Sequence, residues 1–339
     1  MTAVDDRVGV VIPCHATHRW PQLVAAVESV RAQTPRPAQV VVTVDHNDEL
    51  LDRARRELAG VTVVANGYAR GAAGNRNTGI AATDTPLIAL LDDDATARPG
   101  WLAALVAPFD TDDVIGTGGT IEPRWARPRP VWFPDEFLCA ISATNVSPAA
   151  PTTVRNVWSA RMAMRREAFE AAGAFRVGFA PRGDGTGLED TDLCLRMSRA
   201  VGGRWVHVPD AVVDHTVPAE RTTLRYLLMR CFREGRGKVE LARLLGGRHV
   251  LDVERAYLRG TVTRAVLRGL GKALSGKGSA HAARAGVVVA GILAALAGGL
   301  VAFRPSRAPR GPAPLTVPPR YTIVSPVSDP ATPAVGARE

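Results

Sequence analysis

The sequence has few cysteines, and they are not arranged as metal or disulfide sites. Four cysteines, Cys14, Cys139, Cys194 and Cys231, are far apart in 339 residues and form no CxxC pair. This spacing argues against a structural zinc site or a disulfide framework and favours a reducing compartment. The start, MTAVDDRVGVVIPCH, also lacks the features of a secretory signal, because acids precede a very short apolar run. We therefore expect the catalytic part in the cytoplasm.

The sequence also lacks a familiar phosphate-binding loop. No glycine-rich loop of the Walker or GxGxxG type follows the first apolar run, at residues 8–13. The sequence therefore gives little support for an ATPase or a dinucleotide-binding enzyme, and other groups must hold any bound phosphates. A hydrophobic content of 46% is enough for a full core, and this length suits one large domain with an appendage, or two domains.

Acidic residues are scarce in the C-terminal third. Residues 221–310 contain 18 Lys plus Arg against 4 Asp plus Glu, a net charge of +14, so the rest carries −5 of the total of +9. No zinc-finger, RRM or KH pattern accompanies these cations. We therefore expect no nucleic-acid partner and favour an anionic membrane surface.

One uncharged segment lies within this basic third. Residues 285–303 are 19 residues without a charge, about 28 Å as a helix against about 30 Å for a hydrocarbon core. The segment predicts membrane contact, either across the bilayer or in its interface; a packed helix is the alternative, since Ala and Gly dilute its hydrophobicity. The Pro-rich residues 305–339 have little periodic pattern and are predicted to be disordered.

The first half alternates apolar runs with helical periodicity. This alternation predicts an α/β fold with a mostly parallel sheet and helices on both faces. A further helix, beginning near Pro99, is predicted after the fourth run. The predicted strands cover residues 8–13, 39–45, 61–65 and 86–91, and the predicted helices cover 21–33, 48–58 and 74–82.

Three acids, Asp92, Asp93 and Asp94, directly follow the fourth predicted strand. Adjacent carboxylates repel, by about 4 kcal/mol for unit charges 4 Å apart at an effective dielectric near 20. A solvated loop relieves this repulsion, but these acids come at the sheet edge where ligands bind in open α/β folds. A hard divalent cation, Mn²⁺ or Mg²⁺, also relieves it and keeps coordination sites for phosphate oxygens. The sequence therefore predicts a metal and nucleotide diphosphate site.

Five stretches carry a specific resemblance: VGVVIPCH, VVTVDHND, GAAGNRNTGIA, LIALLDDDATARPGWL and GTGLEDTDLCLRM, in this order. Over residues 8–217 the chain resembles the family 2 glycosyltransferases of GT-A fold. The resemblance implies an inverting, metal-assisted enzyme with a nucleotide-activated sugar donor and a hydroxyl acceptor on a glycan, a lipid-linked glycan or a secondary metabolite. Residues after 217 resemble, much less specifically, a subgroup of polyprenyl or dolichyl phosphate sugar glycosyltransferases.

The resemblance assigns the donor site. It implies that Asp45 reads the nucleobase in a pocket lined by Pro13, and that Arg76 faces the nucleotide and its phosphates. A structural role for Arg76, tethering its loop to Asp45, is the alternative. The metal assignment places Asp93 at the ribose or the metal shell and Asp94 on the metal, with Asp92 sharing the work.

The resemblance also assigns the acceptor side. Asp190 is implied to be the general base, with Glu189 contacting the acceptor or orienting Asp190, and Trp158 near the sugar pocket. His215 is implied as a metal ligand, although a structural histidine is an equal alternative. Acidic residues at the start of a helix also stabilise the helix dipole, and this purely structural role is the alternative interpretation of Glu189 and Asp190. The glycine-rich stretch 183–187, predicted to be flexible, leads into this helix.

Other predictions concern the second half. The segment WVHVPDAVVDHTVP predicts two short strands, and Trp125, Trp132 and Phe133 either contact a sugar or lipid or pack on a core. The predicted units are a GT-A domain at 1–217, a basic helical extension at 218–283, an apolar helix at 284–304 and a tail at 305–339.

Two other classes remain open. A sugar-phosphate nucleotidyltransferase shares the sheet type and metal use but needs a glycine-rich, Arg-containing loop after its first strand. A non-catalytic membrane-associated sugar-binding protein is disfavoured by the intact Asp93, Asp94 and Asp190.

Overall fold

The computed structural model describes residues 4–145, 147–177, 188–246, 252–257, 259–260, 263 and 279–302. The predicted flexible stretch 183–187, the end of the predicted apolar helix at 303–304 and the predicted disordered tail 305–339 lie outside these residues.

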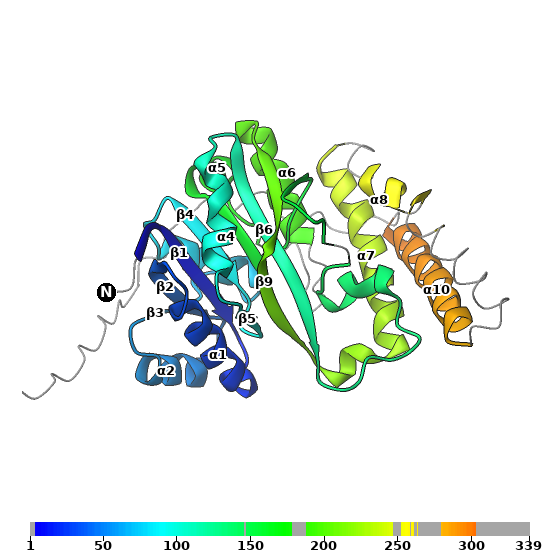
Figure 1. Cartoon of the computed structure of the whole chain (residues 1–339), viewed down its shortest axis with the longest axis horizontal. Coiled ribbons are helices and arrows are strands. Elements are labelled where there is room, and N and C mark those ends of the chain that lie inside the picture. The colour runs from blue at the N-terminus through cyan, green and yellow to red at the C-terminus, as the bar shows by residue number, and fades with distance from the viewer. Residues whose placement is uncertain are drawn as a thin grey trace, which may run out of the picture.

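The first half forms the predicted alternation of strands and helices (Figure 1). β1 pairs in parallel with β2 and with β4, and β2 pairs in parallel with β3. The elements are β1 (Val4–Cys14), α1 (Trp20–Arg31), β2 (Arg36–Val44), α2 (Asp48–Glu57), β3 (Thr62–Ala65), α3 (Ala72–Ala81), β4 (Leu87–Leu91), β5 (Ala95–Ala97) and α4 (Trp101–Val106).

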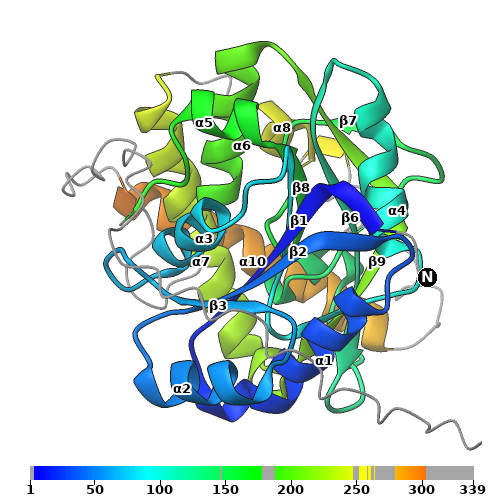
Figure 2. The same cartoon turned by 90° about the vertical axis from the view of Figure 1, so that its left-hand side faces the viewer.

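Both faces of the central strands are buried, which explains why these strands read as continuous apolar runs. In β1, Val10 and Ile12 pack into the cluster that contains Leu23 of α1. Val11, between them, faces the opposite cluster, with Ile80 of α3. Helices therefore cover both faces of the sheet, as Figure 2 shows.

Residues 114–217 complete the sheet in the order β3-β2-β1-β4-β8-β6-β9-β5, with β7 also paired to β9. β8 is antiparallel to β4 and β6, and β5 and β7 are antiparallel to β9, so the sheet is mixed but largely parallel. The elements are β6 (Val114–Trp125), the 3₁₀ segment η3 (Asp135–Ile141), β7 (Thr152–Val154), β8 (Arg161–Arg165), α5 (Arg166–Ala172), α6 (Leu188–Val201) and β9 (Arg204–Val217).

The prediction of two short strands in residues 204–217 is wrong, because β9 is one strand. It stays paired with β6 on both sides of a register shift opposite Gly118 and Thr120. The backbones approach closely there: a Cβ on Gly119 would lie 1.8 Å from the carbonyl oxygen of Ala211. Glycine at this position lets the strand bend without ending.

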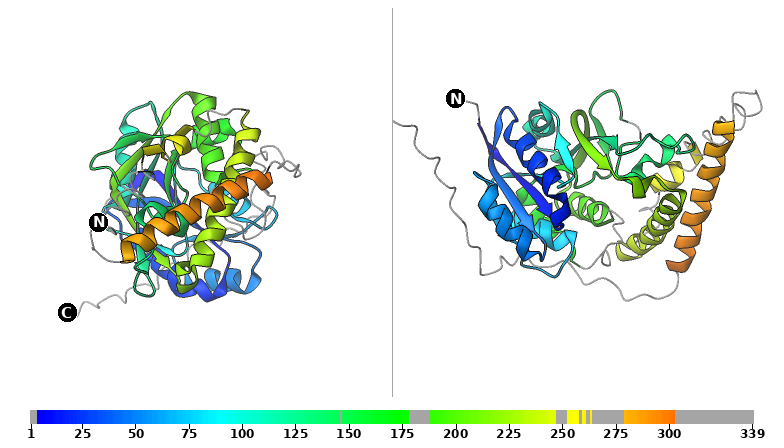
Figure 3. Two further views of the ribbon diagram at one scale, coloured as in Figure 1. Left: turned by 90° about the vertical axis from the view of Figure 1, so that its right-hand side faces the viewer. Right: turned by 90° about the horizontal axis from the view of Figure 1, so that it is seen from below.

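A helical layer, defined as α7 (Leu224–Leu244), α8 (Asp252–Tyr257) and α10 (Ser279–Ala302), follows the sheet. Figures 1 and 3 place α10 on the outer side of α7, away from β1 to β3. Beneath it, Phe133 is fully buried, with ring centroids 5.5 Å from Trp125 and 5.6 Å from Trp132. This cluster includes Leu227 of α7, so the aromatic loop packs as core.

Candidate active site

The three acids after β4 lie in a tight, mostly buried turn at the carboxyl edge of the sheet. The backbone N–H of Ala95 donates to the carbonyl oxygen of Asp92 at 3.1 Å, which closes the turn into β5. Asp93 is only 4% exposed. A solvated loop therefore does not explain these acids, and their repulsion must be relieved by other charges.

Arg19 supplies one of those charges. One of its terminal nitrogens, Nη1, donates to Asp93 Oδ1 at 2.9 Å and lies 3.1 Å from Asp94 Oδ2. Burial still raises the pKa of Asp93 to about 7, because Arg19 offsets it only in part and Asp94 and Asp92 add negative charge. The sequence analysis missed Arg19. The signal for it was a lone arginine in the short segment after the first strand, at the edge where the acids end.

His215 lies beside the third acid because β9 pairs with β5, where His215 is opposite Ala95. Its Nε2 is 3.2 Å from Asp94 Oδ1, and the ring is 1% exposed. Burial raises the pKa of Asp94, but the hydrogen bond and charge of His215 and the charges of Arg19 and Arg221 outweigh burial and hold it at about 2. The structure thus brings together the two residues predicted as metal ligands.

The fit of these residues to a divalent ion is partial. In the described part of the chain, no group of three or more His, Cys, Asp or Glu is arranged to hold a metal ion. Two features suit one: the Asp94 and His215 pair, and Asp93 Oδ2, which is buried without a hydrogen-bond partner. Carboxylate and imidazole ligands suit Mn²⁺. An ion held by so few protein groups needs further ligands, such as diphosphate oxygens.

Arg76 joins the acids after β4 to those at the start of α6. It is buried on α3, with Nη2 3.4 Å from Asp92 Oδ1 and Nη1 3.5 Å from Glu189 Oε1. Nη1 also lies 4.0 Å from Asp190 Oδ1. The alternative that Arg76 tethers its loop to Asp45 is wrong, because its partners among the described residues are these three acids.

Asp190 has one oxygen fixed and one available. Its Oδ2 accepts hydrogen bonds from the backbone N–H of Ser159 at 2.9 Å and from the Ser159 hydroxyl at 3.1 Å. Oδ1 is buried and has no hydrogen-bond partner in the described structure. Burial raises the pKa of Asp190 to about 7, with Arg76 opposing and Glu189 reinforcing the shift. This arrangement suits a general base, whose pKa is best near the working pH. This role of Ser159 was not predicted from the sequence.

A cavity of about 1220 Å³ connects Asp92 after β4 with Glu189 and Asp190 at the start of α6. Five residues predicted for the site line it, namely Arg76, Asp92, Trp158, Glu189 and Asp190, and so does Arg19. The cavity continues into the helical layer, where the lining includes Met229 of α7 and Leu296 and Leu300 of α10. One end is therefore strongly charged, and the end in the helical layer is apolar along α10 but partly charged along α7, as at Arg233 and Lys238.

Five other residues predicted for the site are not among the described residues that line this cavity, namely Pro13, Asp45, Asp93, Asp94 and His215. Asp45 Oδ1 accepts a hydrogen bond from Asn66 Nδ2 at 2.6 Å, and Oδ2 accepts one from the backbone N–H of Gly71 at 3.0 Å. Asp45 thus fixes the segment that leads into α3. Pro13, in β1, pairs with Thr43 of β2. Their roles at a nucleobase remain predictions.

Comparison with known proteins identifies the fold and the domain. Residues 9–173 match the model of Glycosyl transferase family 2. The chain belongs to this family. It is 29% identical over 238 residues to the glucosyl-dolichyl phosphate glucuronosyltransferase of Haloferax volcanii, covering 68% of this chain and 76% of that protein. It is 32% identical over 174 residues to the pre-mycofactocin glycosyltransferase of Mycobacterium tuberculosis, covering 50% of this chain but 34% of that protein.

A solved structure extends the likeness beyond the family match. The mannosyltransferase PcManGT of Pyrobaculum calidifontis, in complex with GDP-Man and Mn²⁺, superimposes with a TM-score of 0.58 over 87% of each chain at 19% identity. This confirms the predicted GT-A fold. The protein is thus a family 2 glycosyltransferase that transfers sugar from a nucleotide sugar, and the nucleotidyltransferase and non-catalytic alternatives are set aside.

Proposed function

We propose that this glycosyltransferase carries out an inverting, metal-assisted transfer from a nucleoside diphosphate sugar to a hydroxyl group of a glycan or lipid-linked acceptor, with Asp190 as the base. The observation that carries the proposal is the asymmetry of the Asp190 carboxylate. Oδ2 is held by Ser159, while Oδ1 is buried and free to accept a proton beside Arg76.

In the proposed reaction, Asp190 Oδ1 takes the proton of the acceptor hydroxyl as its oxygen bonds to the anomeric carbon. The bond from that carbon to the diphosphate oxygen breaks, and its electron pair leaves with the diphosphate. Attack opposite the leaving group inverts the anomeric centre. Glu189, 3.5 Å from Arg76, keeps this cation next to Asp190. The charge of Arg76 favours the ionised base, whereas the charge of Glu189 opposes it.

The donor phosphates meet the charged end of the cavity. Arg19 and Arg76 offset negative charge there, and each already bridges two or more acids. Asp94 and His215 would hold a divalent ion, Mn²⁺ or Mg²⁺, with Asp93 beside them. When bound, such an ion acts as a Lewis acid that stabilises the leaving diphosphate. Asp45 and Pro13 are proposed to contact the nucleobase.

The acceptor is proposed to be lipid-linked, at the cytoplasmic face of a membrane. The Haloferax volcanii relative is by name a glucosyl-dolichyl phosphate glucuronosyltransferase. The α10 side of the cavity, lined by Leu296 and Leu300, gives a lipid chain a compatible apolar surface. Residues 280–302 form one helix long and apolar enough to cross a membrane by length and composition, and we propose that it attaches the enzyme to the membrane.

Asp190→Asn tests the base. The variant keeps the side-chain shape but cannot accept the proton, so transfer should fall by roughly 10² to 10⁴. Affinity for a nucleoside diphosphate with Mn²⁺, measured by calorimetry, should stay within a few-fold. The assay follows sugar transfer from a panel of nucleotide sugars to polyprenyl phosphate and glycan acceptors. Near wild-type turnover in this variant would contradict the proposal, and Glu189→Gln would then be the next variant.

Ser159→Ala serves as the companion variant. It removes the hydroxyl hydrogen bond to Oδ2 but leaves the backbone N–H in place. The carboxylate loses a stabilising donor, so the pKa that governs activity should rise, and the acidic limb of the pH and rate profile should move to higher pH. A uniform loss of activity with an unmoved profile would show that Ser159 only supports the local structure.

A further inference from the structure

In helix α10 the large side chains face outward and the small side chains face inward, which is the reverse of a normal surface helix. Its buried positions are small or of modest size, and its most exposed large side chains are apolar. The exposed large side chains are Val289 at 43%, Leu293 at 61%, Leu296 at 55%, Leu300 at 71% and Val301 at 44%, and the buried positions are Ala285, Val288, Gly291, Gly298, Gly299 and Ala302. A surface helix in water normally shows charged residues on its outer face.

This outer face is continuous and uncharged. The exposed positions recur at helical spacing, at residues 282, 286, 289, 293, 296 and 300, and all are Ala, Gly, Val or Leu. Soluble proteins seldom leave so long an apolar stripe uncovered. The stripe, which we call the outer stripe, therefore indicates a non-aqueous surface next to α10.

The inner side of α10 is fixed to α7 by close backbone contacts. A Cβ on Gly235 of α7 would lie 1.9 Å from the carbonyl oxygen of Ala295, and a Cβ on Gly298 would lie 1.9 Å from that of Phe232. Arg243 of α7 also donates a hydrogen bond to the carbonyl oxygen of Ala302. At the other end, Arg284 Nε donates to the carbonyl oxygen of Val131 at 2.7 Å. Both ends of α10 are thus held against the body of the enzyme.

The composition of α7 decides how this pair can meet a membrane. Along its 21 residues α7 carries eight charged side chains: Arg225, Arg230, Arg233, Glu234, Arg236, Lys238, Glu240 and Arg243. If α10 crossed the bilayer in this arrangement, α7 beside it would enter the hydrocarbon as well. Charged side chains are costly there, so the packed pair cannot span.

We propose that α10 lies in the plane of the membrane interface, with the outer stripe in the lipid and α7 on the aqueous side. Amphipathic helices bind in this way, with an apolar face at the boundary of headgroups and acyl chains. Arg243 of α7 is exposed next to the end of α10, where it donates to Ala302, and suits anionic headgroups.

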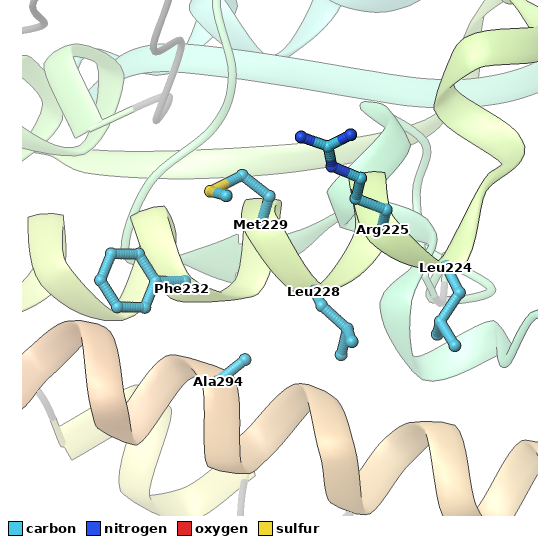
Figure 4. A pocket seen from close by; sticks show the side chains of 6 residues that line it. All are labelled: Leu224, Arg225, Leu228, Met229, Phe232 and Ala294. Carbon is cyan, nitrogen blue, oxygen red and sulfur yellow. The ribbon is translucent and has the colours of Figure 1, made fainter.

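A groove between α7 and α10 supports this placement. It has a volume of about 530 Å³, with a lining that is apolar except for Arg225. Figure 4 shows Leu224 and Leu228 pointing toward α10, while Arg225 points away from it. Met229 lines both this groove and the cavity that contains Asp190. The groove and the cavity thus meet at Met229, where a lipid chain at the membrane surface can approach the active site; this consequence, unlike the placement of α10, rests on the proposed function.

The first test measures binding of the full chain to vesicles of phosphatidylcholine and phosphatidylglycerol by flotation. Leu293→Asn and Val289→Asn remove apolar contacts of the outer stripe without adding charge, and together they should weaken binding at least tenfold. Val201→Asn is the matched control, because Val201 is 45% exposed but lies at the end of α6. Equal loss in the control, or no loss in the stripe variants, would overturn the proposal.

The second test measures orientation with spin labels on Val289→Cys and Leu300→Cys, which are about 16 Å apart along a helix. In-plane binding predicts the same depth at both labels by oxygen and nickel accessibility. A depth difference close to 16 Å would show spanning and overturn the proposal. A dimer in sedimentation without vesicles, dissociated by Leu293→Asn, would also overturn it by showing that a second copy covers the stripe.

These readouts are separate from catalysis. Vesicle binding and label depth need no donor, so they can succeed even if Asp190→Asn retains full transfer and the proposed function fails. Conversely, donor binding with Mn²⁺ can be intact in a protein whose α10 does not bind lipid.

Discussion

The sheet region, residues 4–217, and helix α10 of the helical layer bury opposite kinds of side chain. In the sheet region Leu90 is 1% exposed, because it packs in the hydrophobic cluster between the sheet and the helices on one of its faces. In the helical layer Leu300 is 71% exposed, while Gly298 lies buried against α7. The sheet region thus keeps its large apolar side chains in a core and faces water on its outside. Helix α10 packs through small residues and presents large ones outward, as helices do in lipid.

Truncating one leucine in each region should give the largest difference. Leu90→Ala leaves a cavity in a closed core and should lower the free energy of unfolding by about 2–5 kcal/mol. Leu300→Ala removes atoms that are already exposed and should change it by less than about 0.5 kcal/mol in the absence of lipid. Urea unfolding followed by circular dichroism measures both. If the free energy of unfolding fell by a similar amount in both variants, α10 would be covered in solution. The difference between the two regions would then not exist.

A smaller effect is expected from Gly298→Leu. The new side chain would collide with the carbonyl oxygen of Phe232, 1.9 Å from the ideal Cβ position. Overpacking of this kind costs about 1–3 kcal/mol. Because the close backbone contacts of α10 are with α7, we expect it to separate from α7 while the sheet region stays folded. Limited proteolysis should then release α10, with donor binding preserved. Loss of donor binding would show instead that the two regions unfold together.

The smallest effect concerns the ionic contact between the regions. Glu254 of α8 accepts from Arg155 Nη2 at 2.7 Å and from Lys238 Nζ at 2.7 Å, so it joins the segment after β7 to α7. Burial raises the pKa of Glu254, but these two cations outweigh it and lower the pKa from 4.5 to about 2. The contact is therefore fully formed above pH 4.5 and is lost as pH falls toward 2.

Glu254→Gln should reproduce that loss at neutral pH, with a cost of about 1–2 kcal/mol after allowance for solvent screening. Thermal unfolding from pH 7 to pH 3 measures it. The difference between wild type and variant should shrink as the pH falls below 4.5. A constant difference across this range would show that the carboxylate charge does not hold the two regions together.

Local pattern was enough to predict much of the sheet region. The apolar runs at 8–13 and 86–91 correspond to β1 and β4, because strands buried on both faces leave no polar alternation. The three acids after β4 were predicted at the edge of the sheet where ligands bind, because the carboxyl ends of parallel strands lie at one edge. The length of β9 could not be predicted, since its second half is held as a strand by pairing with β6 across a register shift and with β5.

The partners of the charged groups were beyond sequence reasoning. Arg19 and Asp93 are 74 residues apart, and Arg76 and Glu189 are 113 apart. A single chain shows residue types and spacing but not which distant charges meet. Ser159 likewise fixes Asp190 across 31 residues.

The sequence by itself determined the alternating α/β order, the acid cluster, the family resemblance and the presence of an uncharged helix near residues 285–303. Each depends on neighbours in the chain, where periodicity and composition act directly. Only the tertiary structure decided that Asp190 has one bound and one free oxygen, that Arg19 crosses Asp93 and Asp94, and that α10 faces outward with its leucines. These depend on contacts between distant segments, and the packing of α10 against a charged α7 is the observation on which its proposed place in the membrane interface rests.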